Sequence, residues 1–294
     1  MAIEDVATLN QDFDLIVSTG VLHHLADPQQ GMDALAACLR PDGVMAIMVY
    51  AKYGRQGVEM MQSVFRDLEL SQDEQSLAIV NDALTRVSNR HPVKAYMNIA
   101  PDLQFDAGVV DTFLHGRDRS FTVDDVLELV SSAGLVFQDW LLKSSYYPPV
   151  MSDSSFHAMV CALPQQRQWS IMERIYSTNA CHYFTACRPE RRVDSYTITF
   201  EGDEFLRYVP SFRHSCGFDD THAYRPGWKT PVDPFAKALL QGIDGQRTVA
   251  ELIADASQSD FPRSSQSDIT ELSRKVFASF WQLDFLAMPI PSRG

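Results

Sequence analysis

The chain has 294 residues, of which 45% are hydrophobic and 21% charged, and its formal net charge is −13. This length can hold one large or two ordinary domains, and this composition is typical of a globular protein. The acidic balance argues against sequence-independent binding of nucleic acid, because that role needs positive charge to neutralise phosphates.

The five cysteines are odd in number and scattered, which favours a reducing compartment over a disulfide scaffold. The first five residues lack the basic and apolar parts of a signal peptide, and no apolar run is long enough to span a bilayer. We therefore expect a cytoplasmic location and no membrane partner.

Residues 13–28, FDLIVSTGVLHHLADP, predict a strand, a turn and the start of a helix. Leu15 to Ser18 form a short apolar run with β-branched residues, typical of a buried parallel strand. Gly20 lets the backbone leave the strand and permits close approach of a ligand. Asp27 and Pro28 suit the cap and first position of a helix over 27–38. In such units ligands bind beyond the carboxyl ends of the strands.

The next segment predicts a second strand and a helix. The turn LRPDG at 39–43 precedes the apolar run at 44–50, which predicts a central strand, and a helix follows to about residue 70. The polar, aromatic, glycine-bearing turn at 50–57 again lies at a strand's carboxyl end. That position favours a role in a ligand site over an ordinary surface loop.

Residues 71–163 predict helices and two closing strands. We expect a helix over 71–90 capped by Ser71, an irregular segment over 94–110, and a helix over 124–133 between Thr122 and Gly134. Strands are expected over 135–142 and 156–163, paired antiparallel.

The stretch DTFLHGRDRSFTV at 111–123 has two interpretations. It is either a lid or acceptor-site element, or a loop held by Arg–Asp pairs and anchored by Phe113 and Phe121. His115 is a candidate catalytic base because an imidazole titrates near neutral pH. No other catalytic residue is assigned.

The amino-terminal sequence resembles the region around the fourth strand of class I S-adenosylmethionine-dependent methyltransferases. The resemblance rests on residues 13–28 together with the LRPDG turn and the strand after it. The resemblance runs from about residue 3 to 163. It implies an α/β fold, a partial Rossmann-like sheet of strands four to seven. The family's opening strands and its Gly-rich E/D-x-G-x-G-x-G cofactor turn have no counterpart, so we expect an amino-terminally truncated domain.

The resemblance also implies S-adenosylmethionine as the cofactor and two sets of site residues. The cofactor-binding set is Ser18, Thr19, Gly20, Val21 and His24. The acceptor-side set is Tyr50, Lys52, Tyr53, Arg55, Asp111, His115, Arg117 and Arg119.

The remaining chain predicts a connector and a small module, which gives domains at 1–163, 164–232 and 233–294. We expect a helix over 169–178, a hairpin over 196–209, a long connector over 210–232, helices over 234–243, from Thr248 and over 267–283, and a closing strand over 285–290. LLQGIDGQRTVAELIADA at 239–256 resembles winged-helix-like modules of the PqqD type, for which peptide or intramolecular docking is the expected role.

Two groups of cysteine and histidine invite a metal-binding interpretation. Neither matches a standard zinc spacing, so no metal is predicted. The groups are Cys181, His182 and Cys187, and His214, Cys216 and His222.

Two functions remain open from the sequence. The first is a methyltransferase acting on an unknown acceptor, inactive as this chain alone because half of its sheet is missing. The second is a catalytically silent binding protein. In both, half a sheet would expose an edge that a protein partner or a second copy must cover.

Overall fold

The computed structural model describes residues 2–257 and 266–290, and the chain divides into two compact units. Unit 1 comprises Met1–Leu141 and Trp169–Arg191, and unit 2 comprises Leu142–Gln168 and Arg192–Gly294. Each unit is therefore built from two separate segments. The units divide at different residues from the predicted boundaries at 163 and 232, because residues 169–191 belong with the amino-terminal segment.

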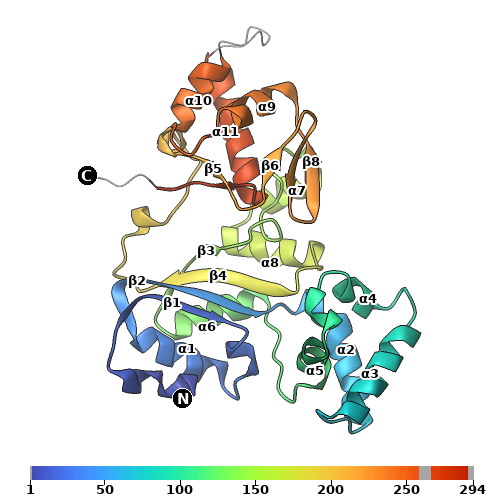
Figure 1. Ribbon diagram of the computed structural model, residues 1–294. Coiled ribbons are helices and arrows are strands. Elements are labelled where there is room, and N and C mark those ends of the chain that lie inside the picture. Colours follow the sequence, from blue (N-terminus) through green and yellow to red (C-terminus); the bar gives the residue numbers. More distant parts are fainter. Residues whose placement is uncertain (1, 258–265, 291–294) are drawn as a thin grey trace. The chain divides into compact units, whose positions relative to one another are not determined.

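Unit 1 contains a mixed sheet with the strand order β1-β2-β4-β3 (Figure 1). Its strands are β1 (Phe13–Thr19), β2 (Leu39–Tyr50), β3 (Val136–Trp140) and β4 (Cys181–Cys187). β1 and β2 are parallel, with Thr19 opposite Met48, whereas β4 is antiparallel to both β2 and β3. The predicted α/β class and the strands expected at 15–18, 44–50 and 135–142 are confirmed. The burial predicted for the strand at 15–18 is wrong, because this strand lies at the edge of the sheet and exposes Leu15 and Val17.

The strand predicted at 156–163 is wrong. Ser155–Cys161 form the helix α7 in unit 2, and the side chain of Ser154 accepts a hydrogen bond from the backbone of His157. The antiparallel partner of β3 is β4, which lies further along the chain. A short apolar run does not distinguish a strand from a helical turn by periodicity, and here the cap favours the helix.

Two helices, α1 (Pro28–Ala37) and α6 (Val123–Ser132), lie side by side against the sheet (Figure 1). Asp27 caps α1 as predicted, and Thr122 forms a reciprocal capping box with Asp125 at the start of α6. The amide of Gln29 donates to the carbonyl of Leu129 and ties the helices together. Both predicted helices are confirmed.

Unit 1 also contains a helical cluster with its own apolar core. It consists of α2 (Gln56–Asp67), α3 (Glu74–Arg86), α4 (Pro92–Met97) and α5 (Asp106–Leu114). The predicted Ser71 cap is wrong, since Asp73 accepts the bond from Ser76. The prediction of irregular structure over 94–110 is wrong too, because α4 and most of α5 occupy it. These two helices are short and bury only a few side chains, so they lack a clear helical period.

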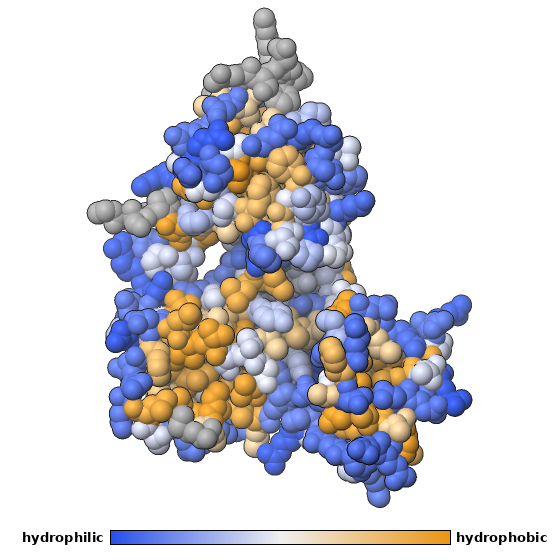
Figure 2. Space-filling model, viewed as in Figure 1, coloured by the Kyte–Doolittle hydropathy of each residue, from blue (hydrophilic) through white to orange (hydrophobic). Residues whose placement is uncertain are grey.

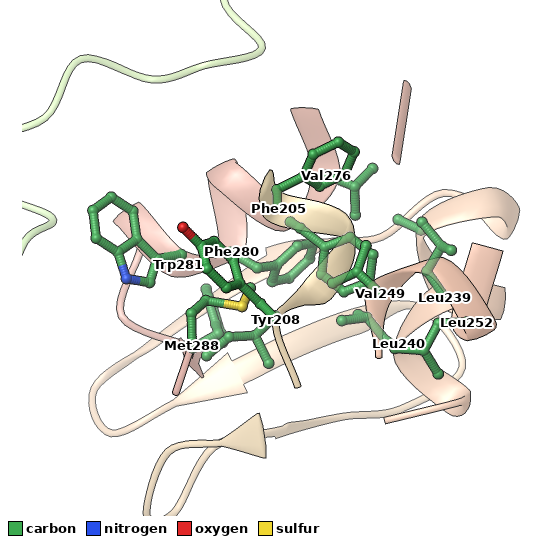
Figure 3. Packing of buried hydrophobic residues seen from close by; sticks show 14 of the residues in the cluster. Phe205, Tyr208, Leu239, Leu240, Val249, Leu252, Val276, Phe280, Trp281 and Met288 are labelled. Atoms are coloured by element: carbon green, nitrogen blue, oxygen red, sulfur yellow. The ribbon is translucent and has the colours of Figure 1, made fainter. Parts of the chain in front are cut away.

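Unit 2 packs helices and short strands around a second core, shown in Figure 3. Phe205, Tyr208, Val249, Phe280 and Trp281 lie in this core. The elements are α7, α9 (Pro234–Gln241), α10 (Val249–Ala256), α11 (Gln266–Gln282), β5 (Ser211–Phe212), β6 (Gly217–Phe218), β7 (His222–Arg225), β8 (Trp228–Pro231) and β9 (Leu286–Ala287). A further helix, α8 (Gln165–Ile175), begins in unit 2 and ends in unit 1.

The hairpin predicted over 196–209 is wrong, and the long connector predicted over 210–232 contains the short strands β5 to β8. The first stretch contains the 3-10 helix η6 (Glu204–Arg207), and the backbone of Thr199 donates to the hydroxyl of Tyr208. The hairpin lies instead at β7–β8, with Gly227 at φ +75° in its turn. Phe205 and Tyr208 are drawn into the core, which overrides the local strand pattern. The predicted helices after Asp233 and Thr248 are confirmed.

β1 exposes apolar side chains at an edge of the sheet. Leu15 is 60% and Val17 62% exposed, and β1 pairs with β2 alone among the described strands. Figure 2 shows apolar surface over the part of unit 1 that holds β1 and α1. Within the described ranges, no helix has the length and apolarity to cross a membrane.

Candidate functional site

The carboxyl ends of β1 and β2 lie at the same edge of the sheet, because the two strands are parallel. Gly20 follows β1 at φ +75°, and a Cβ placed there would meet no atom within 4 Å. The hydroxyl of Ser18 is buried and has no hydrogen-bond partner among the described residues. The turn after β1 therefore combines open space with an unused polar group.

The loop at 115–121 attaches to this edge through its backbone. Phe121 N donates to Tyr50 O at 2.8 Å, and Lys52 N donates to Phe121 O at 2.9 Å. Arg119 N donates to His23 O at 3.0 Å. The stretch predicted to be a lid or acceptor element therefore forms a wall beside the turns after both strands.

Asp118 lies at the centre of the polar cluster in this wall, and its side chain is 7% exposed. Its Oδ2 accepts hydrogen bonds from Arg55 Nη2 at 3.0 Å and Gln62 Nε2 at 2.7 Å. Its Oδ1 lies 2.9 Å from His24 Nδ1 and 3.5 Å from His115 Nδ1, without hydrogen-bond geometry to any described residue. One carboxylate oxygen is thus satisfied and the other faces two imidazoles.

Arg55 supplies the positive charge that compensates Asp118. Its side chain is 1% exposed, its Nη1 donates to the hydroxyl of Tyr96 at 3.0 Å, and its guanidinium lies 3.5 Å from the ring centroid of Tyr50. A buried guanidinium needs such partners because its desolvation costs several kcal/mol, on the order of the values seen for buried ions. Arg55 is therefore a structural cation of this wall.

Tyr50 and His23 are neutral groups within the same cluster. Burial raises the pKa of Tyr50, although Arg55 opposes the shift, so its hydroxyl stays protonated and donates to Asp111 Oδ2 at 3.3 Å. The ring centroid of His23 lies 3.7 Å from that of Tyr50. Burial, and then the charges of His24 and Arg55, lower the pKa of His23 to about 3, so it is uncharged at neutral pH.

The predicted site residues divide into two groups in the structure. His24, Tyr50, Arg55, Asp111 and His115 come together in one cluster. The exposed side chains of Lys52, Arg117 and Arg119 have no described contact with that cluster, and Tyr53 lies half-buried in the 3-10 helix η3 (Tyr53–Arg55). Arg117 does reach the cluster through its backbone carbonyl, 3.1 Å from His24 Nδ1.

Four members of the cluster were missed by the sequence analysis: His23, Gln62, Tyr96 and Asp118. Asp118 lies within the motif RDR at 117–119, but only its tertiary pairing with Arg55 distinguishes it from its neighbours. Gln62 and Tyr96 lie on α2 and α4, where no local pattern indicates their role. Their common signal is a polar side chain on a buried helix face, visible only once the packing is known.

Known proteins resemble this chain in sequence and in fold. Residues 1–88 match the sequence model of the methyltransferase domain family. An uncharacterised protein of Synechococcus sp. is 29% identical over 276 residues, covering 87% of this chain and 64% of the relative.

Solved structures of PKMT2 from Rickettsia typhi share the fold over 98% of this chain and 60% of theirs. The structure in complex with AdoHcy has a TM-score of 0.64 at 13% identity. A second PKMT2 structure has a TM-score of 0.65 at 14% identity. The chain thus spans about three fifths of the length of these relatives. The methyltransferase resemblance predicted for the amino-terminal part is confirmed: residues 1–88 match the methyltransferase domain model, and the chain shares the fold of PKMT2.

Proposed function

We propose that this chain is the part of an S-adenosylmethionine-dependent methyltransferase that carries the acceptor-side wall and half of the cofactor site. One observation carries the proposal. The open Gly20 turn lies at the carboxyl end of a parallel strand pair, in a fold shared with a protein solved with AdoHcy. Ligands of open α/β sheets bind at this edge.

On this proposal, Ser18, Thr19, Gly20, Val21 and His24 line the methionine side of the cofactor. The buried hydroxyl of Ser18 supports this placement, since it has hydrogen-bonding capacity to offer a ligand. S-adenosylmethionine supplies an activated methyl group when bound. Transfer then depends chiefly on holding the acceptor in line with that group.

The acceptor would meet the wall formed by Tyr50, Asp111 and His115. Tyr50 is held protonated and donates to Asp111, whose side chain is half-exposed, so the wall presents an oriented carboxylate to the acceptor. The proposed role of this wall is to orient the acceptor. His115, 30% exposed, is our candidate general base at this wall in the metal-free protein.

Titration calorimetry with S-adenosylmethionine and AdoHcy tests the proposal, with Gly20→Ala as the informative variant. Gly134 is its matched control, because it has a similar φ of +69° and equally open space, in the turn before β3. We expect Gly20→Ala to weaken cofactor binding and Gly134→Ala to leave it unchanged. Equal effects of the two substitutions would remove the cofactor role of Gly20.

The exposed edge of β1 supports a second candidate, a binding protein without catalysis. Leu15 and Val17 present apolar side chains on a strand that pairs on one side only among the described residues, and such edges pair readily with another strand. We propose that the occupant is additional polypeptide that continues this sheet, as the greater length of the fold relatives suggests. A second copy of the chain is the competing occupant.

The oligomeric state of the chain decides between these occupants. We expect the chain to sediment as a monomer. This monomer should bind the cofactor weakly unless the polypeptide that continues the sheet at β1 is added. A dimer that is abolished by Leu15→Lys with Val17→Lys would assign the edge to a second copy instead. Cofactor binding by the isolated monomer at full strength would exclude the need for any occupant.

For residues 233–294 we propose a winged-helix-like module that docks a peptide or another part of the protein. The succession of α9, α10, α11 and the short β9 supports it. The basic residues of α11 argue against contact with nucleic acid, because Arg274 and Lys275 both pair with Glu271. Unchanged migration of a DNA duplex in a gel-shift assay is the expected result.

A further inference from the structure

We propose that His24, His115 and Asp118 hold a divalent transition-metal ion of the zinc class, with the backbone carbonyl of Arg117 as a fourth ligand. The proposal goes beyond methyl transfer and does not depend on cofactor binding. Two imidazoles and one carboxylate form a ligand set that such metals prefer. His24 belongs to the 3-10 helix η2 (Leu22–His24), and the other ligands belong to the loop after α5.

The ligand atoms of His24, His115 and Asp118 all lie within 4.8 Å of one another, and the carbonyl oxygen of Arg117 lies beside both imidazoles. Asp118 Oδ1 lies 2.9 Å from His24 Nδ1 and 3.5 Å from His115 Nδ1. Arg117 O lies 3.1 Å from His24 Nδ1 and 2.8 Å from His115 Nδ1. Ligands about 2.0–2.2 Å from one zinc ion stand roughly 3–3.5 Å apart. The separations of 3.1 and 3.5 Å fit such a shell, and those of 2.8 and 2.9 Å need only a small outward shift.

The free oxygen of Asp118 is an independent indication of a ligand. The carboxylate side chain is only 7% exposed, and its Oδ1 accepts no hydrogen bond from a described residue. Arg55 and Gln62 both bind Oδ2, which fixes the plane of the carboxylate and turns Oδ1 toward the imidazoles. Metal-ligating carboxylates are usually held by such outer partners.

Charge balance also permits a cation at this point. Arg55 neutralises Asp118 in the absence of metal, and Asp111 adds a second negative charge 3.9 Å from His24 Nε2. A histidine that binds metal through Nδ1 carries its proton on Nε2, which here faces that carboxylate. With a divalent ion bound, the charges of Asp118 and Asp111 offset most of the positive charge of the ion and Arg55.

The competing interpretation is a hydrogen-bonded cluster without metal. In that case each Nδ1 carries a proton and donates to Arg117 O or approaches Asp118 Oδ1. Arg117 N also lies 3.2 Å from His115 Nδ1, which suits an unprotonated nitrogen instead. The two interpretations therefore differ in whether protons or a metal ion satisfy the same four atoms.

Zinc binding to the chelator-treated protein tests the proposal by titration calorimetry and elemental analysis after dialysis. We expect one Zn²⁺ per chain, and an affinity lowered by about tenfold or more in His24→Ala and in His115→Ala. His214→Ala, at an exposed histidine of unit 2, is the control and should bind like the parent chain. Equal affinity in the parent and His115→Ala, or no binding by the parent, would overturn the proposal.

Cobalt substitution tests the ligand identity without relying on affinity. Co²⁺ at this site should give visible absorption bands and lack the near-ultraviolet band of thiolate ligation, because no cysteine belongs to the described cluster. A thiolate band would assign the ion to one of the free cysteines and contradict the site. The Asp118→Asn protein, compared by circular dichroism to verify folding, should lose the visible bands.

Discussion

Two buried carboxylates, Asp118 in unit 1 and Asp284 in unit 2, receive very different partners. Both are more than nine-tenths buried, and each pairs with one arginine at 3.0 Å, Arg55 or Arg213. Asp284 also accepts hydrogen bonds from Lys143 N and Ser144 N, so both of its oxygens are satisfied. Asp118 keeps one oxygen directed at two imidazoles.

The difference separates a structural carboxylate from one with capacity for a ligand. Asp284 joins the end of α11 to the segment at 143–144 and leaves nothing for a further group. Asp118 organises a wall at the carboxyl edge of the sheet and retains an unused acceptor. Buried polar groups in native proteins are usually satisfied, so an unused one is informative.

The largest expected effect comes from Arg55→Met. The substitution leaves Asp118 as an uncompensated buried charge and should lower the free energy of unfolding by about 3–5 kcal/mol. Urea denaturation measures it. Arg40→Met is the control, because Arg40 pairs with Asp14 at the surface, where solvent screens the pair, and its loss should cost far less. Similar losses in the two proteins would contradict the role of Arg55.

Asp284→Ala should destabilise the chain by about 2–4 kcal/mol, since two backbone N–H groups and a guanidinium lose their acceptor. Asp284→Asn keeps an acceptor, and asparagine tolerates the φ of +66° at this position, so the loss should be smaller. Thermal unfolding followed by circular dichroism compares the two. Zinc binding should persist in Asp284→Asn, because Asp284 is not a proposed ligand. Loss of zinc binding in this variant would contradict the division into a structural Asp284 and a metal-binding Asp118.

Glu173→Gln should change how stability depends on pH. Burial raises the pKa of Glu173 from 4.5 to about 7, so between these values the folded state holds a proton that the unfolded state has released. Stability from this group is therefore complete below pH 4.5 and is lost as pH rises to 7.

The variant Glu173→Gln has no carboxyl group to titrate and lacks that loss. Its free energy of unfolding, relative to that of the parent, should therefore rise by about 1–3 kcal/mol from acidic to mildly basic pH. The amide oxygen of the substituted side chain would still accept the hydrogen bond that Val123 N donates to Oε1 of Glu173. Burial lowers the pKa of the neighbouring His182 from 6.5 to about 4. Stability from His182 therefore rises with pH up to 6.5 in both proteins, opposite to the effect of Glu173. Denaturation at about pH 5 and pH 8 measures the effect, and a constant difference between the two proteins would contradict it.

The smallest expected effect is that of His115→Ala on the metal-free protein. The side chain is 30% exposed and its main contact is with the backbone of Arg117, so stability should change by less than about 1 kcal/mol. The parent should gain thermal stability on adding Zn²⁺, whereas this variant should gain much less. A large loss without metal would make His115 a structural residue like Asp284.

Much of the fold followed from local signals. The strand and helix of residues 13–38 and the apolar strand at 44–50 matched because their caps, turns and periodicity agree with their final packing. The segments at 94–110 and 196–209 did not match, because the burial of Tyr96, Val109, Phe205 and Tyr208 determines their structure. Short elements with few buried positions carry too little pattern to be predicted.

The sequence by itself determined the family resemblance and the edge of the sheet where a ligand would bind, since both depend on contiguous residues. It also placed His24, Tyr50, Asp111 and His115 among the site candidates. Only the tertiary structure showed that Asp118, Gln62 and Tyr96 join them, and that one oxygen of Asp118 is left for a ligand. The physical reason is that hydrogen-bond satisfaction is a property of groups brought together from α2, α4 and the loop after α5, and no local pattern encodes it.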